Sequence, residues 1–201
     1  SFQQVSEWAR AGFLGEVFSV RAHMSTFLPA EAQQIIADSH KGGIMYDLSG
    51  HVLDQIVWLL GRPDKVTSFL REDGALVAGF KSNGLGVLEF ASAVATVDIA
   101  AQETRPMARR FEIYGTKGSA IIVEPFEPGT RIRLCLDGDR EGYEEGEQVV
   151  EMETRSRQQC YDAELDDFVA VVRDGQEPAR SLEHELLVQE TILRVAGELC
   201  S

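Results

Sequence analysis

The stretch Lys41-Gly-Gly-Ile-Met-Tyr-Asp-Leu-Ser-Gly-His-Val-Leu-Asp-Gln-Ile-Val-Trp-Leu-Leu-Gly-Arg-Pro63 decides how the rest of the chain is arranged. A glycine pair opens it, and Gly61 and Pro63 close it, which is typical of the end of a helix. At about 100° per residue its apolar side chains form one broad helix face, made of Met45, Leu48, Val52, Ile56, Leu59 and Leu60. The stretch therefore predicts one long amphipathic helix that packs on a core.

The opposite face of this helix carries an unusual polar line. At i, i+4, i+7 and i+11 it presents Asp47, His51, Asp54 and Trp58. One interpretation is a solvated face, on which ion pairs of His51 contribute roughly a few tenths of a kcal/mol. The other is that the line faces a cleft, in which Asp47 and His51 handle a proton. Spacing alone leaves both open, because Asp-x-x-x-His pairs are common on helices.

Three glycines accompany this polar line. Gly42 and Gly43 stand directly before the helix and let its backbone approach a bulky group closely. Gly50 lies inside the helix beside His51, where it costs about 1 kcal/mol relative to alanine. Such a cost indicates the close approach of a ligand or of a packed element, and helix–sheet contact explains it equally well.

The composition excludes several classes of function. The chain has 201 residues, 44% of them hydrophobic, and a formal net charge of −14, so it can bury the core of a domain. It offers no basic patch for nucleic acid or an anionic membrane, and no apolar run as long as a membrane span. Cys135, Cys160 and Cys200 are odd in number and far apart, which favours reduced thiols of a cytoplasmic protein.

Alternating, turn-bounded stretches predict the strands of a sheet. They are residues 15–27, 65–72, 75–81, 85–102, 109–114, 119–123, 130–136 and 148–153. Asp73-Gly74 and Asn83-Gly84 predict tight turns between neighbouring strands. The longest strand, 85–102, is apolar on both faces. We therefore expect helices to cover one face of the sheet and another subunit the other.

Helical stretches flank these strands. They are residues 2–10, a short helix within 28–40, residues 158–173, and a last helix capped by Ser181. In the 158–173 helix the residues expected to face inward are Leu165, Phe168, Val169 and Val172. Because short turns join consecutive strands, the sheet must be largely antiparallel. The predicted fold class is α+β: an open sheet of about six or more strands with helices packed on one face.

Several of these stretches together resemble the Gfo/Idh/MocA oxidoreductases, the relatives of glucose–fructose oxidoreductase and inositol dehydrogenase. The most specific part is the quoted stretch, from its glycine pair through Asp47 and His51 to Pro63. The likeness extends over essentially the whole chain, through Gly12-Phe-Leu-Gly15-Glu-Val17, Glu112-Ile-Tyr-Gly115-Thr-Lys-Gly118-Ser, Tyr161-Asp-Ala-Glu-Leu165 and the helix that follows Arg180. The family usually has glycine where Ser49 stands, and often where Ile44 stands.

The resemblance implies the second of two domains. Family members join an N-terminal Rossmann domain, which binds NAD or NADP, to an α+β domain that holds the sugar or polyol site and the oligomer interface. Residues 1–12 are then expected to lead in from a missing nucleotide-binding domain, and residues 13–201 to form the substrate-binding and oligomerisation domain. No Gly-x-Gly-x-x-Gly opens a helix after a strand here, and the catalytic lysine belongs to the first domain. We therefore expect this chain alone to be inactive.

The resemblance also assigns roles to residues. Asp47 and His51 match the catalytic pair: His51 would accept the proton of the substrate hydroxyl while hydride passes to the nicotinamide. A histidine titrates near neutrality, which suits a general base, and a nearby carboxylate stabilises its charged form. The expected substrate contacts are His23, Ser25, Gly43 and Asp54. A homodimer or homotetramer through the sheet face is expected, and no metal.

Two other functions remain as alternatives. The same fold can serve as a non-catalytic domain for oligomerisation or partner binding. A metal-dependent hydrolase or isomerase would use Asp47 and His51 with His40 or His23. This second alternative is disfavoured, because a metal site on a helix normally shows a second histidine at i+4.

Overall fold

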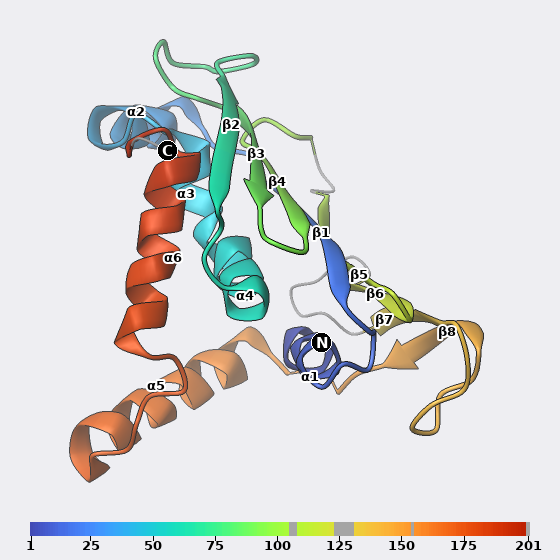
Figure 1. Ribbon diagram of the computed structural model, residues 1–201. Helices are drawn as coiled ribbons and strands as arrows, with labels where there is room; N and C mark the ends of the chain where they lie inside the picture. The colour runs from blue at the N-terminus through green and yellow to red at the C-terminus, as the bar shows by residue number, and fades with distance from the viewer. Residues whose placement is uncertain (105–107, 123–130, 154, 200–201) are drawn as a thin grey trace.

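The computed structural model of the protein describes residues 1–104, 108–122, 131–153 and 155–199 (Figure 1). Its helices are α1 (Phe2–Arg10), α2 (Ala30–Ser39), α3 (Ile44–Leu48), α4 (Gly50–Leu60), α5 (Arg157–Asp174) and α6 (Leu182–Val195). Its strands are β1 (Val17–Ser25), β2 (Lys65–Arg71), β3 (Asn83–Glu89), β4 (Val94–Ala100), β5 (Arg109–Gly115), β6 (Gly118–Ile122), β7 (Arg131–Leu136) and β8 (Gly146–Glu151). Residues 123 and 130, at the ends of two predicted strands, and Cys200 lie outside the described residues.

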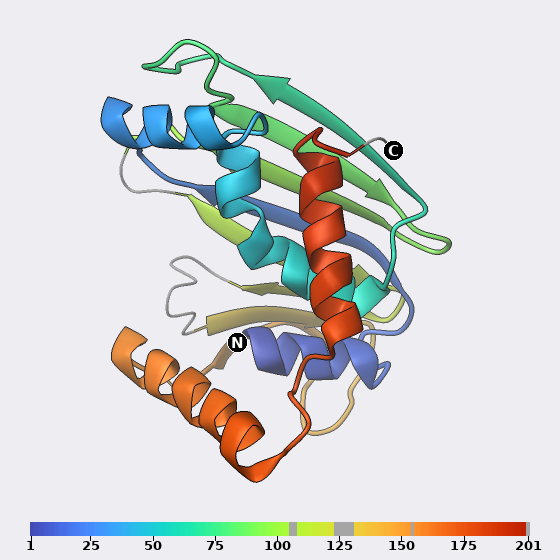
Figure 2. The same cartoon turned by 90° about the vertical axis from the view of Figure 1, so that its left-hand side faces the viewer.

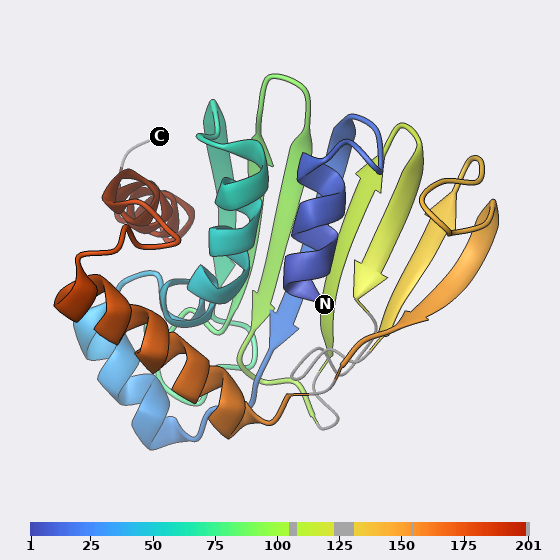
Figure 3. The ribbon, with the colours of Figure 1, turned by 90° about the horizontal axis from the view of Figure 1, so that it is seen from below.

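All eight strands form one open sheet in the order β2-β3-β4-β1-β5-β6-β7-β8. Every neighbouring pair is antiparallel except β1 with β4, which run parallel. Helices α1, α3, α4 and α6 lie over one face of the sheet (Figures 2 and 3). The predicted fold class, a largely antiparallel α+β sheet with its helices on one face, is confirmed.

The core lies between this helix layer and the sheet. From the sheet it takes alternate side chains of β1 and β4, such as Val20, Met24 and Val97, and from the helices Leu53 and Ile56. All five are 0–1% exposed. The period-2 pattern of the strands and the apolar stripe of α4 therefore meet in one buried layer.

The predicted long helix of residues 44–60 is divided at Ser49 into α3 and α4. The prediction of a single helix was wrong in this detail. The apolar stripe still faces the sheet: Met45, Val52 and Ile56 are fully buried. Ser49 is itself buried, and its hydroxyl has no hydrogen-bond partner within the described residues.

The strand prediction between residues 65 and 102 was wrong in three places. Residues 75–81 form no strand, because β2 pairs directly with β3 across the connection 72–82. Asn83 and Gly84 lie within β3 and form no turn. The stretch 85–102 is no single strand but holds most of β3, a turn, and β4. At that turn the Phe90 N–H donates to the Ala93 carbonyl at 2.9 Å.

The same turn explains why residues 85–102 look apolar on both faces. In β3 the even-numbered residues are buried, as Leu88 is, whereas in β4 the odd-numbered residues are, as Val97 is. The residues that face the core are therefore even-numbered before the turn and odd-numbered after it. When residues 85–102 are treated as one strand, core-facing residues fall on both of its faces. The hairpin at Gly115–Gly118 and the pairing of β7 with β8 match the predictions.

Helix α5 departs from its predicted packing. Its four residues expected to face inward are 38–69% exposed, and no residue of the helix is buried. The helix extends away from the sheet below α1 (Figure 1). At its start Ser156 and Gln159 make a capping box, and at its end Gly175 adopts a left-handed conformation. Helix α5 does carry its apolar side chains on one side, but no described residue covers that side.

Among the described residues, no helix covers the other face of the sheet (Figure 1). By strand register its exposed side chains include Phe69, Leu85, Val94 and Val149. Charged side chains such as Arg21 stand between them. This face is therefore the one on which a second subunit was expected.

Candidate functional site

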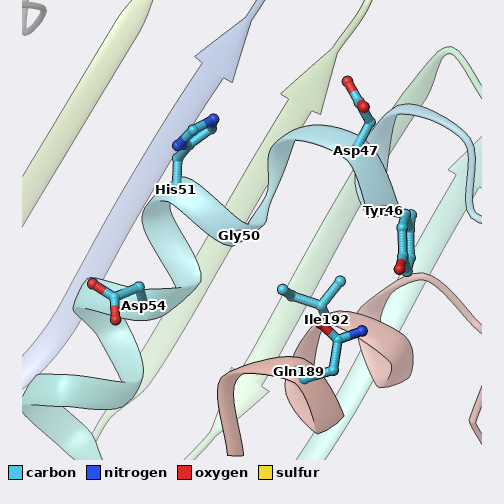
Figure 4. Close-up of a pocket in the computed structure, with 7 residues that line it drawn as sticks. All are labelled: Tyr46, Asp47, Gly50, His51, Asp54, Gln189 and Ile192. Carbon is cyan, nitrogen blue, oxygen red and sulfur yellow. The ribbon is translucent and has the colours of Figure 1, made fainter. Parts of the chain in front are cut away.

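A hollow of about 400 Å³ opens on the helix layer (Figure 4). Its lining comes from the α3–α4 segment and from α6, and consists of Tyr46, Asp47, Gly50, His51, Asp54, Gln189 and Ile192. Figure 4 shows Asp47 and His51 projecting from the α3–α4 segment, with Gln189 and Ile192 on the neighbouring α6. The structure thus brings three of the predicted site residues, Asp47, His51 and Asp54, to one place.

Asp47 and His51 are both exposed. Within the described part of the chain, neither side chain has a hydrogen-bond or ion-pair partner. Both are therefore available to a ligand that enters the hollow. Tyr46, at the edge of the hollow, is held by stacking on His40, with ring centroids 3.6 Å apart.

The three glycines of this segment allow close packing against other parts of the same chain. A Cβ on Gly50 would lie 3.2 Å from Ile192 Cδ1, so the glycine lets α6 approach α4 beside His51. A Cβ on Gly42 would collide with Ala196 at the end of α6. Gly43 has φ +56°, and a Cβ there would meet the backbone of Lys81. Of the two explanations left open for Gly50, the structure supports close packing.

Asp54 differs from Asp47 in having several partners. Its Oδ1 lies 2.7 Å from His184 Nε2, and its Oδ2 accepts from Gln55 Nε2 at 2.6 Å and from Arg180 Nη2 at 3.5 Å. Arg180 also lies over the indole of Trp58, 3.7 Å from the ring centroid. Of the four residues of the predicted polar line, Asp47 and His51 have no side-chain partner among the described residues. Asp54 is hydrogen-bonded to neighbouring side chains, and Trp58 contacts Arg180.

His23 and Ser25 lie on the other face of the sheet. Their neighbours Ala22 and Met24 are buried under the helices, and strand alternation turns His23 and Ser25 away. His23 lines a second hollow of about 380 Å³ together with Asp98 and Glu103. Ser25 is fully buried and donates to the Ala108 carbonyl. The structure does not bring either residue together with His51.

The carboxylates around His23 affect its protonation. Its Nδ1 lies 3.1 Å from Asp98, and its Nε2 lies 3.2 Å from Glu103. The hydrogen bond with Asp98 raises the pKa of His23 above its ordinary 6.5, although partial burial opposes the shift. The raised pKa favours the protonated form of His23, in which both carboxylates are its ion-pair partners.

Among the described residues, one group has ligand atoms close enough to share a metal ion: Asp54, His184 and Glu185. It contains neither Asp47 nor His51, nor His40 or His23, the residues considered for a metal site. The Arg180 guanidinium beside Asp54 opposes a second cation at this point. The donor set is therefore better described as an ion-pair cluster.

Sequence inspection missed Gln189, Ile192 and His184. They lie about 130 residues after the quoted stretch, and no local pattern links them to it. For His23 a signal was available: its neighbours Val20, Ala22 and Met24 are the apolar members of the strand, so His23 had to face away from the core.

The open sheet and the helices on one of its faces define the class: a two-layer α+β domain with a hollow in its helix layer that is lined by Asp47 and His51, among others. A sequence model described as the GFO/IDH/MocA C-terminal domain matches residues 2–121, more than half of the chain. The chain therefore belongs to the Gfo/Idh/MocA family, as a C-terminal domain. None of the curated protein sequences matches it.

Solved structures share the fold. Levoglucosan dehydrogenase in complex with NADH and L-sorbose has a TM-score of 0.73 at 17% identity, covering 96% of this chain and 60% of its own. The UDP-N-acetylglucosamine 3-dehydrogenase of Acidithiobacillus ferrooxidans has a TM-score of 0.73 at 18%, covering 98% and 59%. An oxidoreductase of Agrobacterium radiobacter in complex with NAD+, L-tartaric acid and magnesium gives the same values. The chain thus spans about three fifths of the length of these neighbours.

Neither the sequence nor the described part of the structure shows the Rossmann dinucleotide-binding motif. The sequence has no Gly-x-Gly-x-x-Gly between a strand and a helix, and the only parallel strand pair in the described sheet, β1 with β4, does not flank such a turn. Separately, none of the described helices is long and apolar enough to cross a membrane.

Proposed function

We propose that this chain is the substrate-binding and catalytic domain of an NAD(P)-dependent dehydrogenase that oxidises a hydroxyl of a sugar, polyol or related compound. The observation that carries the proposal is that His51 and Asp47 line the same hollow in the helix layer, and that neither side chain has a hydrogen-bond or ion-pair partner among the described residues. Membership of an oxidoreductase family and neighbours that are sugar dehydrogenases support it.

The proposed chemistry is the oxidation of a CH–OH group to a carbonyl. His51 takes the hydroxyl proton, which leaves the bonding electrons of the O–H bond to form the carbonyl π bond. A nicotinamide held by the complete protein would supply the acceptor for the hydride that leaves the carbon. Asp47 lies four residues before His51 in the sequence. Its carboxylate stabilises the imidazolium that forms and accepts a hydrogen bond from a neighbouring substrate hydroxyl.

The lining of the hollow favours a neutral polyhydroxy substrate. Its polar groups are two carboxylates, an imidazole, an amide and a phenol, and none of its lining residues is Lys or Arg. Carboxylates accept hydrogen bonds from hydroxyl groups but repel a second anion. A neutral sugar or polyol therefore fits this chain's contribution better than a sugar acid or a sugar phosphate.

Two further parts of the proposal concern the whole protein. Residues 1–12 lead in from a nucleotide-binding domain that supplies the NAD or NADP site, and residues 13–201 form the substrate domain. The helix-free sheet face, with the exposed Phe69, Leu85 and Val94, associates with a second copy.

The test is turnover of a panel of neutral sugars and polyols, with sugar acids alongside, by the complete protein with NAD and with NADP. We expect at least one neutral compound to be oxidised and its acid analogue to react far more slowly. In the Asp47→Asn variant kcat should fall about 100-fold, whereas Asp64→Asn, at an exposed aspartate outside the hollow, should leave it unchanged. Equal turnover in all three proteins would favour a non-catalytic oligomerisation or partner-binding domain.

A further inference from the structure

Asp54 lies on the hollow, yet its carboxylate is bonded to other side chains. His184 Nε2 is 2.7 Å from Oδ1, and Gln55 Nε2 is 2.6 Å from Oδ2. An ionised carboxylate only accepts hydrogen bonds, so the Nε2 of His184 must carry the proton and donate it. Asp54 is therefore held in place by donors and is not free to act as a base.

His184 is itself held firmly. Its side chain is 8% exposed, and its ring meets Trp58 edge-on, with centroids 5.3 Å apart. Its backbone N–H donates to the hydroxyl of Ser181, which caps α6. Arg180 covers the Trp58 indole and reaches Asp54 from the same chain segment. A donor so tightly packed can fix the position of a carboxylate.

The Asp54–His184 bond joins the two walls of the hollow. Asp54 belongs to α4, three residues after His51, and His184 belongs to α6, which supplies Gln189 and Ile192. Beside it, Ile192 packs onto Gly50. The bond therefore ties His51's helix to the helix that forms the opposite wall.

We propose that His184 is a positioning residue of this site: its Nε2–H holds Asp54, and the bond sets the separation of α4 from α6 and with it the fit of the substrate hydroxyls. The expected effect on substrate binding rests on the proposed function. The hydrogen bond between the two helices is independent of that function. His184 touches no substrate in this scheme, because its side chain is buried behind Asp54.

Two variants of His184 separate positioning from simple packing. His184→Leu keeps an apolar side chain but removes the donor, whereas His184→Gln places an amide N–H near the position of Nε2. In the complete protein with a polyol substrate, we expect His184→Leu to raise KM about tenfold with kcat changed less than about threefold. His184→Gln should restore KM to within about threefold of the original value. A glutamine variant as impaired as the leucine variant would overturn the proposal.

A second measurement does not depend on activity. It is a double-mutant cycle, in which urea unfolding is measured for four proteins: the original protein, Asp54→Asn, His184→Leu and the double variant. If the hydrogen bond between Asp54 and His184 is charge-assisted, the effects of the two single substitutions should not add: the double variant should differ from their sum by at least about tenfold in the unfolding equilibrium constant. Additive effects would overturn the proposal. If the coupling is present while Asp47→Asn leaves turnover intact, the proposed function fails and the bond between the walls stands.

Discussion

Replacing Gly43 by alanine should cost far more stability than the same change at Gly61. The two glycines hold nearly the same backbone conformation, with φ +56° and ψ −131° at Gly43 and φ +77° and ψ −148° at Gly61. Their surroundings differ. A Cβ on Gly61 would meet no atom within 4 Å, whereas a Cβ on Gly43 would collide with the Lys81 carbonyl oxygen and lie 2.7 Å from the Lys81 nitrogen. The pair therefore separates backbone strain from steric contact.

The magnitude follows from these contacts. An L-residue in this backbone region costs about 1–3 kcal/mol, and both variants should lose that amount. At Gly43 the colliding atoms are backbone and cannot rotate away, which adds about 1–3 kcal/mol. Moving Lys81 also weakens the bond that its carbonyl accepts from the Ile44 N–H at 2.9 Å, for about 1 kcal/mol. Gly43→Ala should therefore cost about 2–4 kcal/mol more than Gly61→Ala.

Urea unfolding followed by circular dichroism measures this difference, provided that the m-value is the same in both variants. The Gly43 carbonyl accepts the backbone N–H of Asp47 at 3.2 Å, so the displacement should also reach the site. Equal losses of stability in the two variants would refute the reasoning, because they would show that the contact with Lys81 yields at little cost.

Three further predictions concern stability and protonation. Ser49→Ala removes a buried hydroxyl without a partner and should raise the free energy of unfolding by about 1 kcal/mol in urea titrations, so a loss would show that the hydroxyl is satisfied. Phe168→Ala, at a side chain 63% exposed, should change that free energy by less than about 0.5 kcal/mol, whereas Ile56→Ala, in the core, should cost about 2–5 kcal/mol. Comparable losses would place α5 against a core. Because Asp98 raises the pKa of His23, the charged histidine contributes stability that is fully present below pH 6.5 and is lost as pH rises through the raised value. Proton NMR should show this pKa falling toward 6.5 in Asp98→Asn, and an unchanged pKa would exclude Asp98 as its cause.

Much of the fold could be predicted because its signals are local. The hairpin at Gly115–Gly118 and the cap at Ser181 depend on residues that are neighbours in sequence. The turn at 90–93 could not be found in the same way, since Phe-Ala-Ser-Ala contains neither Gly nor Pro. The turn predicted at Asp73-Gly74 does form, since the Ala75 N–H donates to the Glu72 carbonyl at 3.0 Å, but it lies inside the longer connection 72–82 and does not join two paired strands directly. The rest of this connection packs Phe80 into the core, which no local turn signal could predict.

The site divides in the same way. Asp47 and His51 could be predicted because one short segment carries both. The wall formed by Gln189 and the donor His184 could not, since only the packing of α6 on α4 brings them there. The apolar stripe of α5 was identified correctly as a pattern, but a pattern does not say what covers it.

The measurement that most directly tests the central claim is single-turnover hydride transfer by the His51→Ala variant of the complete protein, saturated with a polyol and the preferred cofactor. If His51 accepts the hydroxyl proton, the rate should fall about 100- to 10,000-fold. Because His51 is exposed at the hollow, added imidazole should restore part of the rate. An unchanged rate in His51→Ala would contradict the assignment of His51 as the general base.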